Sequence, residues 1–145
     1  MNITFFGHSF FSNKEDSEEK MIKLIENISG GKEINFLLGG YGQFDDFAYL
    51  CAKKYQEKHN NCKLIFVSPY LNPEYYKLKN AKMYYDESIY PPIESTPLRF
   101  AISKRNEWMI DNSDYIIFYV GVKFGAAYNA LKYCIRKKKK YTNIY

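Results

Sequence analysis

Residues 34–46 of this chain read Ile34-Asn35-Phe36-Leu37-Leu38-Gly39-Gly40-Tyr41-Gly42-Gln43-Phe44-Asp45-Asp46. The apolar run that opens this segment predicts a buried strand, and residues 47–54 after it predict a helix. Glycines between a strand and a helix permit backbone conformations that other residues avoid, and they let a ligand approach the main chain closely. The free N–H groups at the start of the helix favour anions. The segment therefore predicts either a phosphate-binding turn or a plain strand-to-helix turn, and the glycines alone do not decide between them.

The length of the chain limits the number of domains, and its charge limits the kinds of partner. The chain has 145 residues, which suits a single domain over residues 1–145. The net charge is +5, and much of the basic excess lies in residues 136–140, which we interpret as the solvated end of the last helix. A nucleic-acid interface would need basic residues spread over one face with exposed aromatic side chains among them. We therefore do not expect nucleic acid as a partner.

The cysteines and the apolar runs are typical of a cytoplasmic protein. Cys51, Cys62 and Cys134 are an odd number without metal-ligand spacing, so we expect buried thiols in a reducing cytoplasm and no metal site. Met1 leads almost directly into a strand, so we expect no signal peptide. We also expect no membrane segment, because no apolar run is long enough to span a bilayer.

Strand and helix patterns alternate along the whole chain. Strands are expected at residues 3–7, 34–38, 63–67, 83–85, 115–120 and 141–145. Helices are expected after a capping box at residues 12–15, with a stop at residues 30–31, and then at residues 47–54, 71–78, 99–112 and around 127–134. This alternation predicts an α/β fold with a mainly parallel sheet of about six strands and helices on both faces.

The loops that leave the carboxyl ends of parallel strands lie side by side, so their polar and glycine residues are the candidate site. The candidate ligand-binding residues are Gly7, His8, Ser9, Gly39, Gly40, Tyr41, Gly42, Asp45, Tyr90, Glu94, Arg99, Arg105, Asn106, Gly125 and Ala126. A phosphate would meet the glycine turn and the amides at residues 125–126. Arg105 would neutralise its charge, and Tyr41 or Tyr90 would stack on a base.

Several of these residues have a structural interpretation beside the functional one. His8 is either an acid–base or phosphate-binding group, or a hydrogen-bonding residue at a strand end. Asp45 and Asp46 bind ribose hydroxyls, or cap the following helix. Glu94 points into the site or is solvated on its loop. Arg105 and Arg99 grip a phosphate, or lie on the surface or pair with Glu107 or Asp111.

The motifs in this order resemble those of small bacterial proteins of the SLOG superfamily, which is related to the Lonely-Guy phosphoribohydrolases and to the DNA-processing protein DprA. The motifs are Phe6-Gly7-His8-Ser9, Gly39-Gly40-Tyr41-Gly42-Gln43-Phe44-Asp45, Val67-Ser68-Pro69-Tyr70, Tyr85-Asp86, Ile89-Tyr90-Pro91-Pro92-Ile93-Glu94, Arg105-Asn106-Glu107-Trp108-Met109 and Ser113-Asp114. They run through nearly the whole chain. The resemblance implies a Rossmann-like, doubly wound fold and a pocket for a nucleotide or a nucleotide-derived ligand.

The resemblance also frames the choice between binding and catalysis. Many members of the superfamily are ligand sensors in phage–host conflict, and others are N-glycosidases that use an Arg, matched here by Arg105, and a later Glu. The position of that Glu falls on Asn129, which cannot stabilise an oxocarbenium-like charge. We therefore expect binding of a nucleoside monophosphate or an ADP-ribose-like compound, without a cofactor. The alternatives are an N-glycosidase that uses Glu94 or Asp46 with Arg105, and a protein-interaction module with a vestigial pocket. We expect a homodimer.

Overall fold

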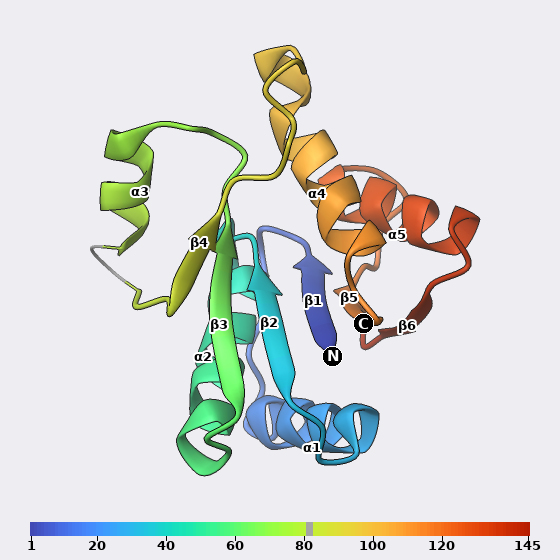
Figure 1. Ribbon diagram of the computed structural model, residues 1–145. Helices are drawn as coiled ribbons and strands as arrows, with labels where there is room; N and C mark the ends of the chain where they lie inside the picture. Colours follow the sequence, from blue (N-terminus) through green and yellow to red (C-terminus); the bar gives the residue numbers. More distant parts are fainter. Residues whose placement is uncertain (81–82) are drawn as a thin grey trace.

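The computed structural model describes residues 1–80 and 83–145 and contains one parallel sheet (Figure 1). Its strands are β1 (Asn2–Gly7), β2 (Ile34–Leu38), β3 (Cys62–Val67), β4 (Glu87–Ile89), β5 (Tyr115–Tyr119) and β6 (Lys140–Asn143), in the order β4-β3-β2-β1-β5-β6. The helices are α1 (Ser17–Ser29), α2 (Gln43–Lys58), α3 (Pro73–Asn80), α4 (Ala101–Asp111), which follows the 3-10 turn η1 (Leu98–Phe100), and α5 (Ala126–Arg136). The predicted α/β fold with a sheet of about six parallel strands is confirmed.

The order of the strands places three loops together. β1 lies between β2 and β5, with Thr4 opposite both Leu37 and Ile116. The buried hydroxyl of Thr4 also donates to the carbonyl of Leu37 at 2.9 Å. Because all these strands run the same way, the loops after β1, β2 and β5 leave one edge of the sheet as neighbours. They are the three glycine-containing loops that the sequence singles out.

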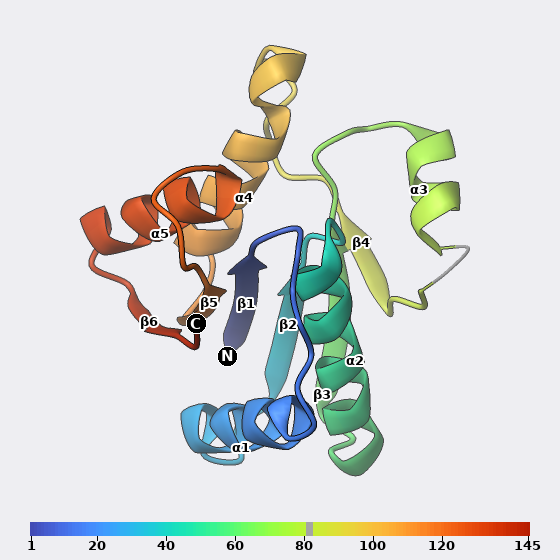
Figure 2. The same ribbon diagram turned by 180° about the vertical axis from the view of Figure 1, so that it is seen from behind.

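Alternate residues of the strands face two separate apolar layers, because successive side chains point to opposite faces. Phe5, Phe36 and Phe66 pack with α1 and α2, which lie in front of the sheet in Figure 2. Phe6 and Phe118 point the other way and pack with α4 and α5. The prediction of helices on both faces is confirmed. Among the described residues, no helix is long and apolar enough to cross a membrane.

Phe44, in the first turn of α2, fills the space beneath the edge of the sheet where these loops meet. It is fully buried, and its ring contacts those of Phe11 and Tyr119, with centroids 5.4 and 5.6 Å away. A Cβ on Gly7 would lie 2.3 Å from this ring, so the end of β1 approaches α2 only because residue 7 is glycine. The ring therefore fixes the first loop against the start of α2.

Two predicted features are wrong in detail. The strand expected at residues 83–85 lies instead at Glu87–Ile89, because Tyr85 packs its ring against Phe66, with centroids 5.2 Å apart, while the ladder with β3 begins at Glu87 opposite Ile65. The capping box at residues 12–15 is also absent, since α1 begins at Ser17 without a side-chain cap. The stop at residues 30–31 is confirmed, because Gly30 adopts the left-handed conformation after α1.

We predict that Phe44→Ala lowers the free energy of unfolding by about 3–5 kcal/mol, because it leaves a cavity under the loops. Phe10→Ala is the matched control, since Phe10 is 75% exposed, and we expect a change within about 0.5 kcal/mol. Urea denaturation followed by circular dichroism measures both. Equal losses in the two variants would contradict the placement of Phe44 in the core.

Candidate functional site

A hollow of about 610 Å³, which we call the mouth, lies where the loops after β1, β2 and β5 meet. It is lined by Gly7, His8, Ser9, Phe10, Ser12, Tyr41, Tyr119, Val122, Phe124, Gly125, Ala126, Ala127 and Tyr145. A smaller hollow of about 50 Å³, the inner hollow, shares Gly7, Tyr41, Ala126 and Ala127 with it and adds Gly39, Asp45, Arg105 and Asn106. Most of the predicted ligand-binding residues therefore lie around two adjoining spaces.

Arg105 of α4 is buried beneath the inner hollow and is only 3% exposed. Its Nη1 donates to the carbonyl oxygens of Val67 at 2.7 Å and Gly39 at 3.2 Å, and its Nε donates to Oδ1 of Asn106 at 2.9 Å. It pairs with neither Glu107 nor Asp111. The guanidinium thus joins α4 to the ends of β2 and β3, and burial lowers its pKa.

The remaining nitrogen of Arg105 is the part open to a ligand. Nη2 donates a hydrogen bond to none of the residues that the structure describes, and it lies 3.3 Å from the point where a Cβ on Gly39 would stand. A side chain at residue 39 would crowd this nitrogen and the carboxylate of Asp45 together. The glycine therefore keeps the approach to Nη2 clear.

Asp45 lies in the first turn of α2 and is half-buried beside Arg105. Its Oδ2 accepts the N–H of Tyr41 at 2.8 Å, so it closes the glycine turn. It does not cap α2, because the N-cap residue of that helix is Gly42 and its start has no side-chain cap. Burial raises the pKa of Asp45 to about 7, although the hydrogen bond from Tyr41 and the charge of Arg105 oppose this rise. Asp45 therefore changes charge near neutral pH.

The helix starts at α2 and α5 have the same backbone but differ in what occupies them. The residues before them, Gly42 and Gly125, have φ of 95° and 94° with ψ of 173° and 174°. At α2 the N–H of Gln43 already donates to the carbonyl of Ser9 at 2.8 Å. At α5 no side chain caps the helix, and the amides of Ala126 and Ala127 donate to no group among the described residues. The first amide of α5 is therefore open, whereas the first amide of α2 is occupied.

His8 has a structural role at this edge. Its Nε2 accepts the N–H of Gly121 at 2.8 Å, and its ring lies edge-on to the rings of Tyr119 and Tyr145. The neutral ring must then carry its proton on Nδ1. His8 joins the loops after β1 and β5, and this matches the structural one of its two interpretations.

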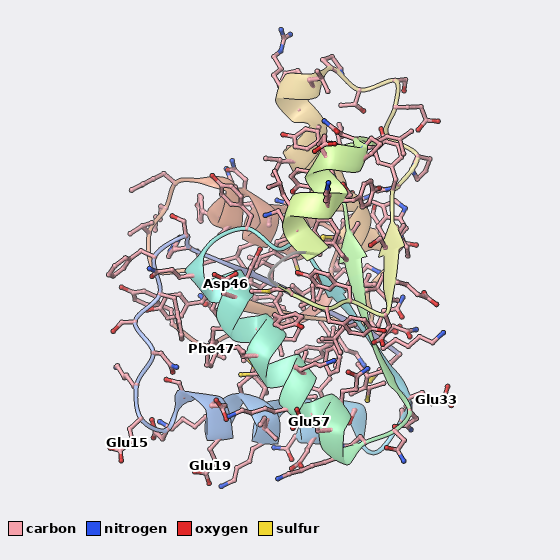
Figure 3. All side chains as sticks on the ribbon, turned by 90° about the vertical axis from the view of Figure 1, so that its left-hand side faces the viewer. Glu15, Glu19, Glu33, Asp46, Phe47 and Glu57 are labelled. Carbon is pink, nitrogen blue, oxygen red and sulfur yellow. The ribbon has the colours of Figure 1, made fainter. Side chains whose placement is uncertain are left out.

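The expected carboxylates do not gather at the mouth. Asp46 is exposed on the first turn of α2, as Figure 3 shows, and it lines a separate hollow of about 420 Å³ together with Tyr75 and Lys79 of α3. Glu94 is exposed on the loop after β4, and neither it nor Tyr90 lines any of these hollows. Within residues 1–80 and 83–145, no three His, Cys, Asp or Glu side chains come together in a way that could hold a metal ion.

Tyr41 lies where three of the hollows adjoin. Its side chain is 64% exposed, and it lines the mouth, the inner hollow and the hollow beside α3. Arg99 lies apart from it on η1, with its guanidinium 4.8 Å from the ring centroid of Phe100. It lines a groove between α4 and α5, and not the mouth. Of the predicted stacking and charged residues, Tyr41 and Arg105 therefore meet at the site, whereas Tyr90 and Arg99 do not.

Sequence reasoning missed three exposed aromatic residues that line the mouth, namely Phe10, Phe124 and Tyr145, with exposed fractions of 75%, 73% and 70%. Phe124 adjoins Gly125, and this neighbour was the available signal. Tyr145 reaches the mouth because β6 pairs with β5 and carries the end of the chain past Gly121. A Cβ on Gly121 would lie 2.0 Å from the ring of Tyr145, so this close approach also depends on a glycine.

We predict a pH dependence that arises from Asp45. Between an unfolded pKa of about 4 and the folded value of about 7, the folded chain holds a proton that the unfolded chain has lost. This stabilisation is complete below pH ~4 and is lost as the pH rises through the folded pKa. The free energy of unfolding of the wild type should therefore fall from pH ~4 to ~8 relative to Asp45→Asn, as urea denaturation would measure. Parallel curves for the two proteins would contradict this assignment.

Comparison with known proteins reveals a shared fold. No protein-family model and no curated protein sequence matches the chain. It superposes on DNA processing protein A (DprA) from Streptococcus pneumoniae and on that from Helicobacter pylori, each with a TM-score of 0.62 and 15% identity over 97% of this chain. It also superposes on the structural-genomics target TM1055, with a TM-score of 0.59 and 14% identity over 97% of this chain. The chain spans 48%, 63% and 71% of the lengths of these three proteins.

These similarities correct one expectation and confirm another. The structure of the Helicobacter pylori protein is described by its single-stranded DNA binding mode, so the expectation that excludes nucleic acid as a partner is contradicted. That expectation relied on the clustering of basic residues at positions 136–140 along the sequence, which does not reveal the residues that share a face in the fold. The Rossmann-like fold implied by the motifs is confirmed. The chain thus has the fold that its resemblance to the SLOG superfamily implies.

Proposed function

We propose that the mouth binds a nucleotide-like ligand, such as a nucleoside monophosphate or an ADP-ribose-like compound, and that the chain acts as a sensor or ligand-binding protein. The observation that carries this proposal is the position of Arg105. Its buried guanidinium has a nitrogen without a partner among the described residues, and Arg105 lines a hollow together with Ala126 and Ala127 at the start of α5. A buried cation beside free backbone amides is suited to an anionic group.

Different residues of the site bind the phosphate, the base and the ribose of the ligand. The phosphate lies against the amides of Ala126 and Ala127, because at the glycine turn Asp45 and Ser9 already accept the N–H groups of Tyr41 and Gln43. The base stacks on the exposed ring of Tyr41, which borders the same space. Asp45 accepts a ribose hydroxyl when it is charged, and when protonated it adds no repulsion to the phosphate.

The arrangement favours binding over hydrolysis of an N-glycosidic bond. Such hydrolysis requires a carboxylate that stabilises positive charge on the sugar. Glu94 is exposed away from the mouth, Asp46 lines the hollow beside α3, and the position of the catalytic Glu in related enzymes is Asn129 here. Release of free base from nucleoside monophosphates, seen by chromatography, would instead support the glycosidase alternative. A protein-interaction module would bind no nucleotide at all.

Single-stranded nucleic acid is the second candidate ligand, and a separate observation favours it. Phe10, Tyr41, Phe124 and Tyr145 are all more than half exposed, and all line the mouth. Exposed aromatic rings beside a cationic groove are the usual platform for unstacked bases. The Helicobacter pylori protein with this fold is described as binding single-stranded DNA, and this supports the same candidate.

We predict that Tyr41→Ala weakens binding of AMP or ADP-ribose by about 5-fold or more, because the base loses its stacking partner. Tyr84→Ala is the matched control, since Tyr84 is similarly exposed, at 67% against 64%, but lines none of these hollows. Isothermal titration calorimetry with AMP, ADP-ribose and oligothymidylate separates the two candidate ligands. The proposal of a nucleotide-like ligand fails if neither AMP nor ADP-ribose binds.

We predict that Ala126→Pro weakens the binding of phosphate-containing ligands by about 10-fold and leaves the binding of the nucleoside without phosphate unchanged. Ala126 is the first residue of α5, where proline fits a helix and only removes the N–H. An unchanged melting temperature, measured by circular dichroism, shows that α5 still forms. If Ala126→Pro is folded and binds AMP as the wild type does, the phosphate does not lie at α5.

A further inference from the structure

A basic groove lies between α4 and α5, next to the mouth. It has a volume of about 610 Å³ and is lined on one side by residues of η1 and α4 and on the other by residues of α5. It begins at Gly125 and Ala126, which also line the mouth, so the two spaces meet at the uncapped start of α5. The groove can therefore hold a part of a ligand that continues beyond the mouth.

The charge of the groove is positive and largely uncompensated. Arg99, Lys132 and Arg136 line it, and each of the three is exposed. The acidic side chain that lines it is Glu107, and Glu107 already pairs with Lys104 at 3.1 Å. Beyond Arg136 the basic run continues to Lys140, although Lys139 is held by the carbonyl oxygens of Asp111 and Ser113.

Aromatic rings hold these cations along the surface of α5. The ammonium of Lys132 lies 5.0 Å from the ring centroid of Tyr128, and the guanidinium of Arg136 lies 5.0 Å from that of Tyr133. Tyr133 is fixed in turn by its hydroxyl, which donates to the carboxylate of Asp111 at 2.9 Å. Since Lys132 and Arg136 are four residues apart, they stand about 6 Å apart along the helix axis. Two cations are therefore spaced along the groove.

We propose that the groove between α4 and α5 binds the phosphate backbone of a single-stranded nucleic acid, one nucleotide of which occupies the mouth. This inference rests on the proposed function of the mouth, and it adds a second site that the mouth does not require. The basic residues come from η1 and α5 and have tyrosines among them, which is the arrangement that a nucleic-acid interface needs. A free mononucleotide does not need this groove.

The test is the affinity of labelled oligothymidylate of about ten nucleotides, measured by fluorescence anisotropy across a salt series. The double variant Lys132→Glu with Arg136→Glu should weaken binding by at least about 10-fold, and its plot of log affinity against log salt should be about 1.4 units shallower. The control Lys23→Glu with Lys32→Glu changes the net charge equally on α1 and the turn after it, where both lysines are exposed. It should leave oligonucleotide binding within about 2-fold, because neither lysine lines the groove.

Measurement of AMP binding separates this inference from the proposed function, and measurement of polyglutamate binding separates nucleic acid from acidic peptides. If the groove variant loses oligonucleotide binding but keeps AMP binding, and Tyr41→Ala loses both, then both proposals stand. If the oligonucleotide needs the groove while no mononucleotide binds, the proposed function of the mouth fails and the groove site stands. If the groove variant binds the oligonucleotide as the wild type does, the inference fails. It fails equally if the variant loses only binding of polyglutamate, which would show that the groove binds acidic peptides.

Discussion

The site depends on one buried contact, the grip of Arg105 on the carbonyl oxygens of Gly39 and Val67. Removal of a guanidinium from water costs several kcal/mol, and hydrogen bonds to charged groups return about 1.5–3 kcal/mol each. Three such bonds, two to carbonyls and one to Asn106, are therefore needed to keep the cation in place. Because the two carbonyls belong to the ends of β2 and β3, the same bonds that satisfy the cation fix α4 and the glycine turn relative to the sheet.

The sequence predicted which residues lie at the site better than it predicted the residues that they contact. Strand ends and helix starts follow from local periodicity, so the convergence of Gly7, Gly39 and Gly125 was foreseeable from a parallel sheet. The partners of Arg105 lie 38 and 66 residues away along the chain, and no local pattern identifies them. Loops without a helix or strand are the hardest to place, and so Glu94 and Tyr90, which the sequence groups with the mouth, line neither the mouth nor the inner hollow. The groove between α4 and α5 was missed because its cations come from separate elements.

The two glycine-capped helices show that a backbone motif does not by itself make a site. Gly42 and Gly125 share one conformation within a degree, so sequence reasoning treats α2 and α5 alike. Their surroundings differ, because the loop after β1 packs on α2 and its Ser9 carbonyl accepts a hydrogen bond from Gln43. Nothing lies within 4 Å of the point where a Cβ on Gly125 would stand. The anion preference of a helix start is useful only where the protein has not already satisfied its amides.

The balance of charge explains why the mouth and the groove suit one extended anion better than a compact polyphosphate. At the inner hollow, Arg105 and the start of α5 face Asp45, which carries a full negative charge only above its pKa of about 7. The net positive charge there is thus small and suits a single phosphate group. The groove has three cations and one already paired carboxylate, so most of the uncompensated positive charge lies between α4 and α5. A ligand is attracted by both the inner hollow and the groove only if its negative charges are spread along a chain, with one phosphate at Ala126 and others beside Lys132 and Arg136.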